Sequence, residues 1–197
     1  MLGLLLLVIL LLQTAKAMPN TFFALFAEQQ FHATPMLTGL LFSAAGVGMM
    51  VSASRWGRLF DRLTIVTGMV LLSVIALAAA FCYLAHLYAG WWPLLTIRFG
   101  WGICLGAMLP MVQATMIRLA NSRHNGHLIG TAQGATRFGN LFGVVCGALL
   151  MSQWSYAGGF LGAGFAYLLA AAVLLLSWSR LAQRRTENLR QGAISRS

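Results

Sequence analysis

Acidic residues are almost absent from this sequence. Of its 197 residues only three are Asp or Glu, and 8% in total are charged, whereas about 25% of the residues in a soluble domain are charged. Hydrophobic residues make up 59% of the chain. Because so few charges cannot form a water-facing surface over so much apolar side chain, we expect most of the chain to be surrounded by lipid.

The formal net charge of +10 raises the question of nucleic-acid binding, which a strongly basic domain can indicate. The arginines, however, lie in short clusters between long apolar runs, which is where a membrane protein needs them. We therefore expect the lipid bilayer, and no nucleic acid, as a partner.

Patterns typical of metal sites and enzymes are also missing. The three cysteines, Cys82, Cys104 and Cys146, lie inside apolar runs without metal-ligand spacing, so we interpret them as packing residues. His124 and His127 are three residues apart, but no carboxylate or cysteine joins them. The sequence also offers no strand followed by a glycine-rich phosphate loop. It therefore predicts no metal, no cofactor and no enzymatic activity.

Six apolar segments are long enough to cross a membrane, which takes about 20 residues in a helix. They are 2–27, 36–54, 63–86, 92–118, 127–151 and 157–179. The linkers between them are short, so neighbouring helices are expected to be antiparallel. The sequence thus predicts an all-α polytopic membrane fold, with one domain of six transmembrane helices over 1–180 and a basic cytoplasmic tail over 181–197.

The first segment also resembles a secretory signal peptide, because Ala15-Lys16-Ala17 follows an apolar run in the manner of a cleavage site. No Lys or Arg comes before that run, and apolar residues continue past the site at Phe22 and Phe23. We therefore favour a first spanning helix.

Lys and Arg follow an alternating pattern among the linkers. The first, third and fifth linkers contain neither residue. Arginines lie in the second linker (Arg55, Arg58, Arg62), at the fourth (Arg118, Arg123) and in the tail (Arg180, Arg184, Arg185, Arg190, Arg196). Because cytoplasmic loops have the excess of Lys and Arg, we expect both termini in the cytoplasm, in a multi-pass protein of the cell membrane of the bacterial inner-membrane type.

Glycines recur at a spacing of four residues in three of the expected spans: Gly102 and Gly106 in the fourth, Gly139, Gly143 and Gly147 in the fifth, and Gly158 and Gly162 in the sixth. Residues four apart share one helix face, and a face without side chains lets another backbone approach closely. We interpret these glycines as helix-packing positions. Static packing is the simpler interpretation, and sliding during a transport cycle is the alternative.

Polar residues at membrane depth are usually functional. Gln13, Lys16 and Asn20, at spacings of three and four, form one stripe on the first span. We interpret this stripe as the wall of a substrate cavity that favours anionic groups; the alternative is a lysine that is neutral or paired inside the bundle. The other candidate cavity-lining residues are Arg98, Gln113, Gln133 and Arg137.

Two of these arginines differ in depth. Arg98 lies near the outer end of the fourth span, where its side chain could simply reach the membrane surface, whereas Arg137 lies deeper in the fifth span. No Asp or Glu lies in the middle of any span. If the chain belongs to a proton-coupled carrier, its proton site is therefore expected on another polypeptide or on a missing part of this one.

The residues Gly57-Arg58-Leu59-Phe60-Asp61-Arg62 resemble the G-x-L-x-D-R loop of the major facilitator superfamily. Segments around Arg98, Gly102 and Pro110, and around Arg137 and Gly143, are similar to the tenth and eleventh helices of drug:proton antiporters in that superfamily. The resemblance covers about residues 10–180 and is closest to twelve-helix multidrug efflux carriers.

This resemblance implies that Gly57, Arg58, Asp61 and Arg62 form a cytoplasmic gating loop, although the family's usual basic continuation is replaced by Leu63-Thr64-Ile65-Val66. It also implies that the six spans are helices seven to twelve, the C-terminal half of a carrier whose two halves enclose the substrate.

The function implied is proton-coupled efflux of drug-like or amphipathic small molecules, with a missing N-terminal half or a second copy as partner. The alternatives are a truncated, non-transporting fragment, a membrane scaffold or assembly subunit, and, least favoured, a membrane-embedded enzyme.

Overall fold

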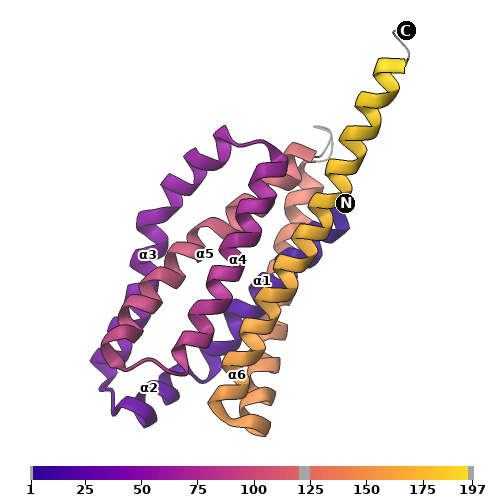
Figure 1. Ribbon diagram of the computed structural model, residues 1–197. Coiled ribbons are helices and arrows are strands. Elements are labelled where there is room, and N and C mark those ends of the chain that lie inside the picture. Colours follow the sequence, from indigo (N-terminus) through magenta and orange to yellow (C-terminus); the bar gives the residue numbers. More distant parts are fainter. Residues whose placement is uncertain (1, 120–124, 195–197) are drawn as a thin grey trace.

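The computed structural model describes residues 2–119 and 125–194, and this part of the chain is helical with short connections and no strand (Figure 1). The elements are α1 (Leu2–Ala17), the 3₁₀ helix η1 (Met18–Thr21), α2 (Phe23–Phe31), α3 (Pro35–Arg62), α4 (Ile65–His86), α5 (Trp91–Leu119) and α6 (Asn125–Ile194). Arg123, His124 and Arg196, which entered the sequence interpretation, lie outside the described residues.

Five described segments are long and apolar enough to cross a membrane, namely Leu2–Thr21, Pro35–Arg62, Ile65–His86, Trp91–Leu119 and Gly126–Ser179. The last has 54 residues, and at about 1.5 Å per residue it would far exceed the bilayer core of about 30 Å if it were straight. It is not straight: the backbone is non-helical at Trp154 and Ser155, and the chain turns back there (Figure 1). We call residues 125–153 and 156–194 the first and second arms of α6. The chain is therefore an all-α, multi-pass membrane protein.

The first expected span, 2–27, is interrupted. Pro19 lies in η1, and because proline lacks a backbone N–H it cannot continue an α-helical hydrogen-bond ladder. The chain leaves η1 through Phe22 with φ −129° and resumes as α2. Pro110, by contrast, lies inside α5, and the helix continues through it.

The connection between α3 and α4 is shorter than expected. Residues 55–62, expected as a linker, form the last two turns of α3. Thr64 is the N-cap of α4, where its side chain accepts a hydrogen bond from the backbone N–H of Thr67, as threonine favours at this position. Because the cap follows so closely, only Leu63 and Thr64 separate the two helices.

Glycine faces bring the helix backbones together. Gly139, Gly143 and Gly147 of the first arm of α6 lie against the backbone of Leu10, Thr14 and Met18. The hydroxyl of Thr14 donates a hydrogen bond of 3.2 Å to the carbonyl of Gly139. Since lipid gives apolar helices little reason to associate, such close packing and interhelical hydrogen bonds are what hold a membrane bundle together.

The second contact of this kind joins α3 and α5. Gly102 lies against the carbonyl of Ala45, and Gly106 lies against Met49 and Ser52. The indole N–H of Trp56, on α3, donates a hydrogen bond of 2.9 Å to the carbonyl of Ile103 on α5. α4 then packs between α5 and α6, so that two helix pairs form one bundle (Figure 1).

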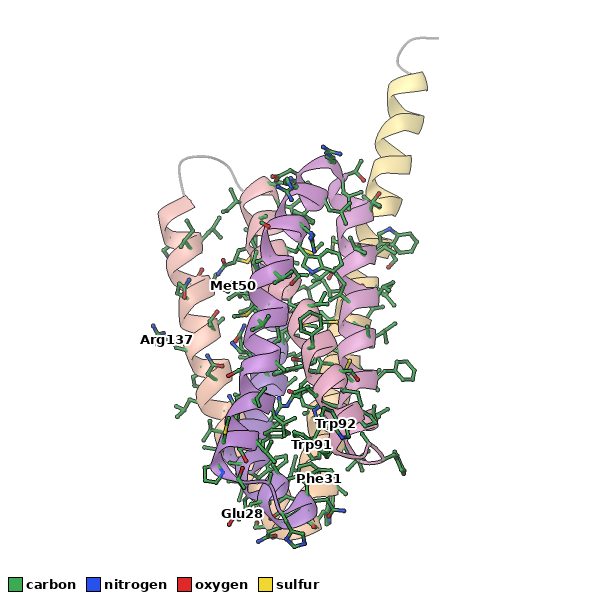
Figure 2. The ribbon with its side chains drawn as sticks, turned by 90° about the vertical axis from the view of Figure 1, so that its left-hand side faces the viewer. Glu28, Phe31, Met50, Trp91, Trp92 and Arg137 are labelled. Carbon is green, nitrogen blue, oxygen red and sulfur yellow. The ribbon has the colours of Figure 1, made fainter. Side chains whose placement is uncertain are left out.

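The bundle has two distinct ends. α2, the α4–α5 turn and the turn between the arms of α6 gather at one end, which we call the α2 end, and both chain termini point towards the other (Figure 1). Trp91 and Trp92 lie at the α2 end together with Glu28 and Phe31 (Figure 2). The second arm of α6 continues as a helix to Ile194 and projects beyond the bundle, where the sequence alone had indicated only a polar, basic tail.

Gly102→Ala is expected to destabilise the protein, because the added Cβ would lie against the Ala45 backbone, 2.9 Å from its Cα. Overpacking of this kind costs about 1–3 kcal/mol. The matched control is Gly100→Ala on the same helix, where an added Cβ meets nothing within 4 Å. Thermal unfolding in detergent, followed by tryptophan fluorescence, checks the pair. Equal midpoints for the two variants would contradict the assigned packing role of Gly102.

Candidate functional site

A cavity of about 430 Å³ lies between α1, α3 and α5. Its polar side chains are Gln13 and Lys16, both on α1. The apolar part of its wall is Leu12, Gly46, Met49, Met50, Ala53, Leu105, Gly106, Met108, Leu109 and Pro110. A concave, mostly apolar surface with a few converging polar groups is what a small-molecule site requires.

Two glycines shape this cavity. Gly106 lines it and also packs against Met49 and Ser52 of α3, so the helix contact sets the depth of the wall. Gly46 has open space where a Cβ would lie, because nothing is within 4 Å of that position. The cavity is therefore open on the side of Gly46 and of Met50, whose exposed fraction is 76% (Figure 2).

Lys16 is half-buried in the last turn of α1. Carbonyl groups at a helix C-terminus favour a nearby cation. Gln13 lies one turn earlier and is buried, and its Oε1 has no hydrogen-bond partner within the described residues. Of the stripe expected from the sequence, the structure thus places Gln13 and Lys16 in one cavity, whereas Asn20 lies exposed in η1 and does not line it.

The other candidate cavity-lining residues are not gathered there. Gln113 is half-buried on α5, and its Nε2 has no partner among the side chains that the structure describes. Gln133 and Arg137 are exposed on the first arm of α6, and Arg137 points away from the bundle (Figure 2). None of the three lines the cavity that contains Lys16.

Arg98 is enclosed by aromatic rings. Its side chain is only 1% exposed, and its guanidinium carbon lies 3.3 Å from the ring centroid of Phe23 and 5.2 Å from that of Trp101. Its Nε and Nη2 make no hydrogen bond to a described residue. The structure therefore places Arg98 inside the bundle, where cation–π contacts surround its charge. The sequence had suggested instead that this side chain could reach the membrane surface.

Sequence reasoning missed the aromatic cluster around this arginine. Tyr83 stacks on His86 with ring centroids 5.4 Å apart and on Tyr167 at 5.7 Å, and it meets Trp101 edge-on at 5.3 Å. The available signal was a spacing of three residues, which places Tyr83 with His86, and Arg98 with Trp101, on one face of each helix. The cluster joins α4, α5 and the second arm of α6.

At the opposite end of the bundle, Asp61 forms an ion pair with Arg118 of α5, with 3.2 Å between Oδ1 and Nη2. Nη1 of Arg118 also donates hydrogen bonds to the carbonyls of Phe60 and Leu63, at 3.3 and 3.2 Å. Arg118 therefore satisfies carbonyl groups at the C-terminus of α3, where a cation is favoured.

The rest of the expected gating loop lies apart from this contact. Arg58 and Arg62 line a shallow pocket with Arg55 and Leu59, and Gly57 is exposed with nothing within 4 Å of an added Cβ. The sequence singled out Asp61 but not its partner Arg118, which follows it by 57 positions.

The sequence model of the Major Facilitator Superfamily matches residues 5–195. The chain belongs to the major facilitator superfamily.

Several superfamily members are similar to this chain. Multidrug resistance protein MdtG of Erwinia billingiae is 30% identical over 151 residues, which cover 75% of this chain and 35% of that protein. MdtG of Serratia proteamaculans is 29% identical over 166 residues, which cover 83% of this chain and 38% of that protein. The uncharacterised MFS-type transporter YuxJ of Bacillus subtilis is 28% identical over 141 residues, which cover 70% of this chain and 34% of that protein. No solved structure gives a significant match. The chain spans about a third of the length of these curated relatives.

In this major facilitator chain, Arg118→Ala is expected to loosen the α3–α4 connection more than Asp61→Asn does. The aspartate is 78% exposed and the arginine 29%, and an exposed ion pair contributes at most about 1 kcal/mol. Loss of Arg118 also removes both carbonyl contacts. Hydrogen–deuterium exchange of amides 60–68 measures the difference.

Arg58→Ala is the control for this comparison. Arg58 is also an arginine but, unlike Arg118, it makes no hydrogen bond to a described residue. Equal exchange in Asp61→Asn and Arg118→Ala would show that the ion pair, which both variants lose, and not the carbonyl contacts, holds the connection.

Proposed function

We propose that this chain is the C-terminal half of a secondary carrier that exports drug-like, amphipathic small molecules across the cell membrane. The observation that carries the proposal is the open cavity between α1, α3 and α5, which combines Lys16 and Gln13 with an otherwise apolar wall. The superfamily match and the relatives named for multidrug resistance support it.

In this proposal the chain crosses the membrane six times. α1 with η1 and α2 forms the first span, α3, α4 and α5 the next three, and the arms of α6 the last two. An even number of crossings agrees with the two termini pointing towards one end (Figure 1). Arg55, Arg58 and Arg62 near that end favour a cytoplasmic location for it, because cytoplasmic loops are rich in arginine.

The partner proposed is an N-terminal half that closes the cavity from the open side. The curated relatives are about three times as long as the matched part of this chain, and superfamily carriers bind substrate between two halves. A second copy of this chain in the same position is the alternative arrangement.

Proton coupling, in the same proposal, depends on that partner. No Asp or Glu lies in the middle of an apolar segment of the sequence. Of the described carboxylates, Glu28 is exposed at the α2 end and Asp61 pairs with Arg118. Proton-driven carriers commonly use buried carboxylates as proton relays, so this proposal assigns the relay to the partner half.

Transport is tested in inverted membrane vesicles from a bacterial strain without its own efflux pumps. The chain, co-expressed with the N-terminal half of a related carrier, is expected to concentrate at least one of two fluorescent dyes, one anionic and one cationic. An uncoupler is expected to abolish the accumulation, because it removes the proton gradient.

Expression of the chain alone, followed by crosslinking, distinguishes an N-terminal half from a second copy as the partner. Transport by the chain alone, together with a crosslinked product of dimer size, would show that a second copy takes the place of the N-terminal half. No transport with or without the N-terminal half would favour a non-transporting fragment or an assembly subunit.

Membrane orientation is tested in a variant in which Cys82, Cys104 and Cys146 are replaced by alanine. Tyr88→Cys in the α4–α5 turn, where the native side chain is 89% exposed, is expected to react with a membrane-impermeant maleimide on intact cells. Arg58→Cys is expected to react only after permeabilisation, because α3 ends at the opposite side. The reverse pattern would overturn the orientation without affecting the fold.

A further inference from the structure

The cavity between α1, α3 and α5 has an uncompensated positive charge. Lys16 is the only charged residue among the described residues that line it, and it makes no ion pair or hydrogen bond with another described residue. Of the described carboxylates, Asp61 is engaged by Arg118, and Glu28 is exposed on α2, at the end of the bundle that holds Trp91 and Trp92.

Electrostatics at this depth discriminates strongly between ligands. The interaction between two charges increases as the effective dielectric constant falls from that of water towards that of a protein interior. A half-buried lysine between three helices therefore attracts an anion and repels a cation far more than an exposed surface lysine does. Arg137 and Arg98 do not contribute to the cavity wall, because one points away from the bundle and the other is buried in the aromatic cluster.

The neighbouring groups suit an amphipathic ligand. Gln13 supplies an amide with both a donor and an acceptor, one turn from Lys16. Met49, Met50 and Met108 provide much of the apolar wall, and methionine side chains adapt to ligands of varied shape. The volume of about 430 Å³ is within the range of about 300–1,000 Å³ found for drug-sized molecules.

We propose that this cavity selects amphipathic monoanions, carboxylates or sulfonates with a bulky apolar body, over lipophilic cations. The anionic group lies at the Lys16 ammonium and the Gln13 amide, and the apolar body lies against the methionines. This inference rests on the proposed function for its biological meaning, because it names the substrate class of the carrier, but it is tested by binding and not by transport.

Two ions of nearly equal size and opposite charge serve as probes, tetraphenylborate and tetraphenylphosphonium. Binding to the purified full chain in nanodiscs of neutral lipid is measured by equilibrium dialysis, with empty nanodiscs subtracted to remove partitioning into lipid. Lys16→Met is expected to weaken tetraphenylborate binding at least tenfold and to leave tetraphenylphosphonium binding unchanged or stronger. Lys16→Glu is expected to reverse the preference.

Arg137→Gln is the matched control, because it removes one positive charge at membrane depth outside the cavity. It is expected to leave the affinity for both ions within about twofold. Should Lys16 variants fail to fold, Met50 offers a second site on the same wall, with an exposed side chain that packing does not require. Met50→Glu is then expected to weaken tetraphenylborate binding, and Met50→Lys to strengthen it.

Unchanged tetraphenylborate affinity in Lys16→Met, or in both Met50 variants, overturns the inference, and so does a wild-type chain that binds neither ion. If the chain binds anions selectively through Lys16 but never transports a dye, the inference is supported and the proposed function is contradicted. Dye transport by a chain whose tetraphenylborate affinity is unchanged by Lys16→Met would support the proposed function and overturn the inference.

Discussion

Close backbone contact between helices is the constraint on which the rest of this structure depends. In lipid, apolar side chains gain little by leaving their surroundings, so helices associate through tight packing and interhelical hydrogen bonds. Gly139 and Gly143 hold the first arm of α6 against α1, the helix that positions Gln13 and Lys16. Gly106 serves the α3–α5 contact and the cavity wall at once. The same small residues therefore hold the bundle together and define the shape of the site.

Much of this architecture could be predicted from the sequence, because its causes are local. Apolar runs of membrane length, arginine in alternate linkers and glycine at a spacing of four each act within one helix or its flanks, and they indicated the long helices and the glycine faces. The break at Trp154 and Ser155 lies between two such runs. Pro19 lies inside the first expected span, but the sequence did not show that η1 would separate α1 from α2 there.

The features that the sequence did not reveal depend on partners distant in the chain. Arg118 is 57 positions from Asp61, so the aspartate could be assigned only to a gating loop, through the family resemblance, and not to a contact between α3 and α5. Arg98 is buried because Phe23, from α2, lies over its guanidinium group. Likewise, Asn20 shares a helical spacing with Lys16, but η1 breaks the helix between them and removes Asn20 from the cavity.

Lys16 and Arg98 illustrate two solutions to one problem, a cation at membrane depth without an adjacent carboxylate. Arg98 is closed off by the faces of Phe23 and Trp101, so its charge is stabilised within this chain and stays out of reach of a ligand. Lys16 has no such enclosure; its surroundings are a helix C-terminus and an open cavity. A charge that the bundle leaves unbalanced must be balanced by whatever occupies the cavity or closes it. For that reason the lysine, and not the more deeply buried arginine, is the residue through which a ligand or a second half can act on this fold.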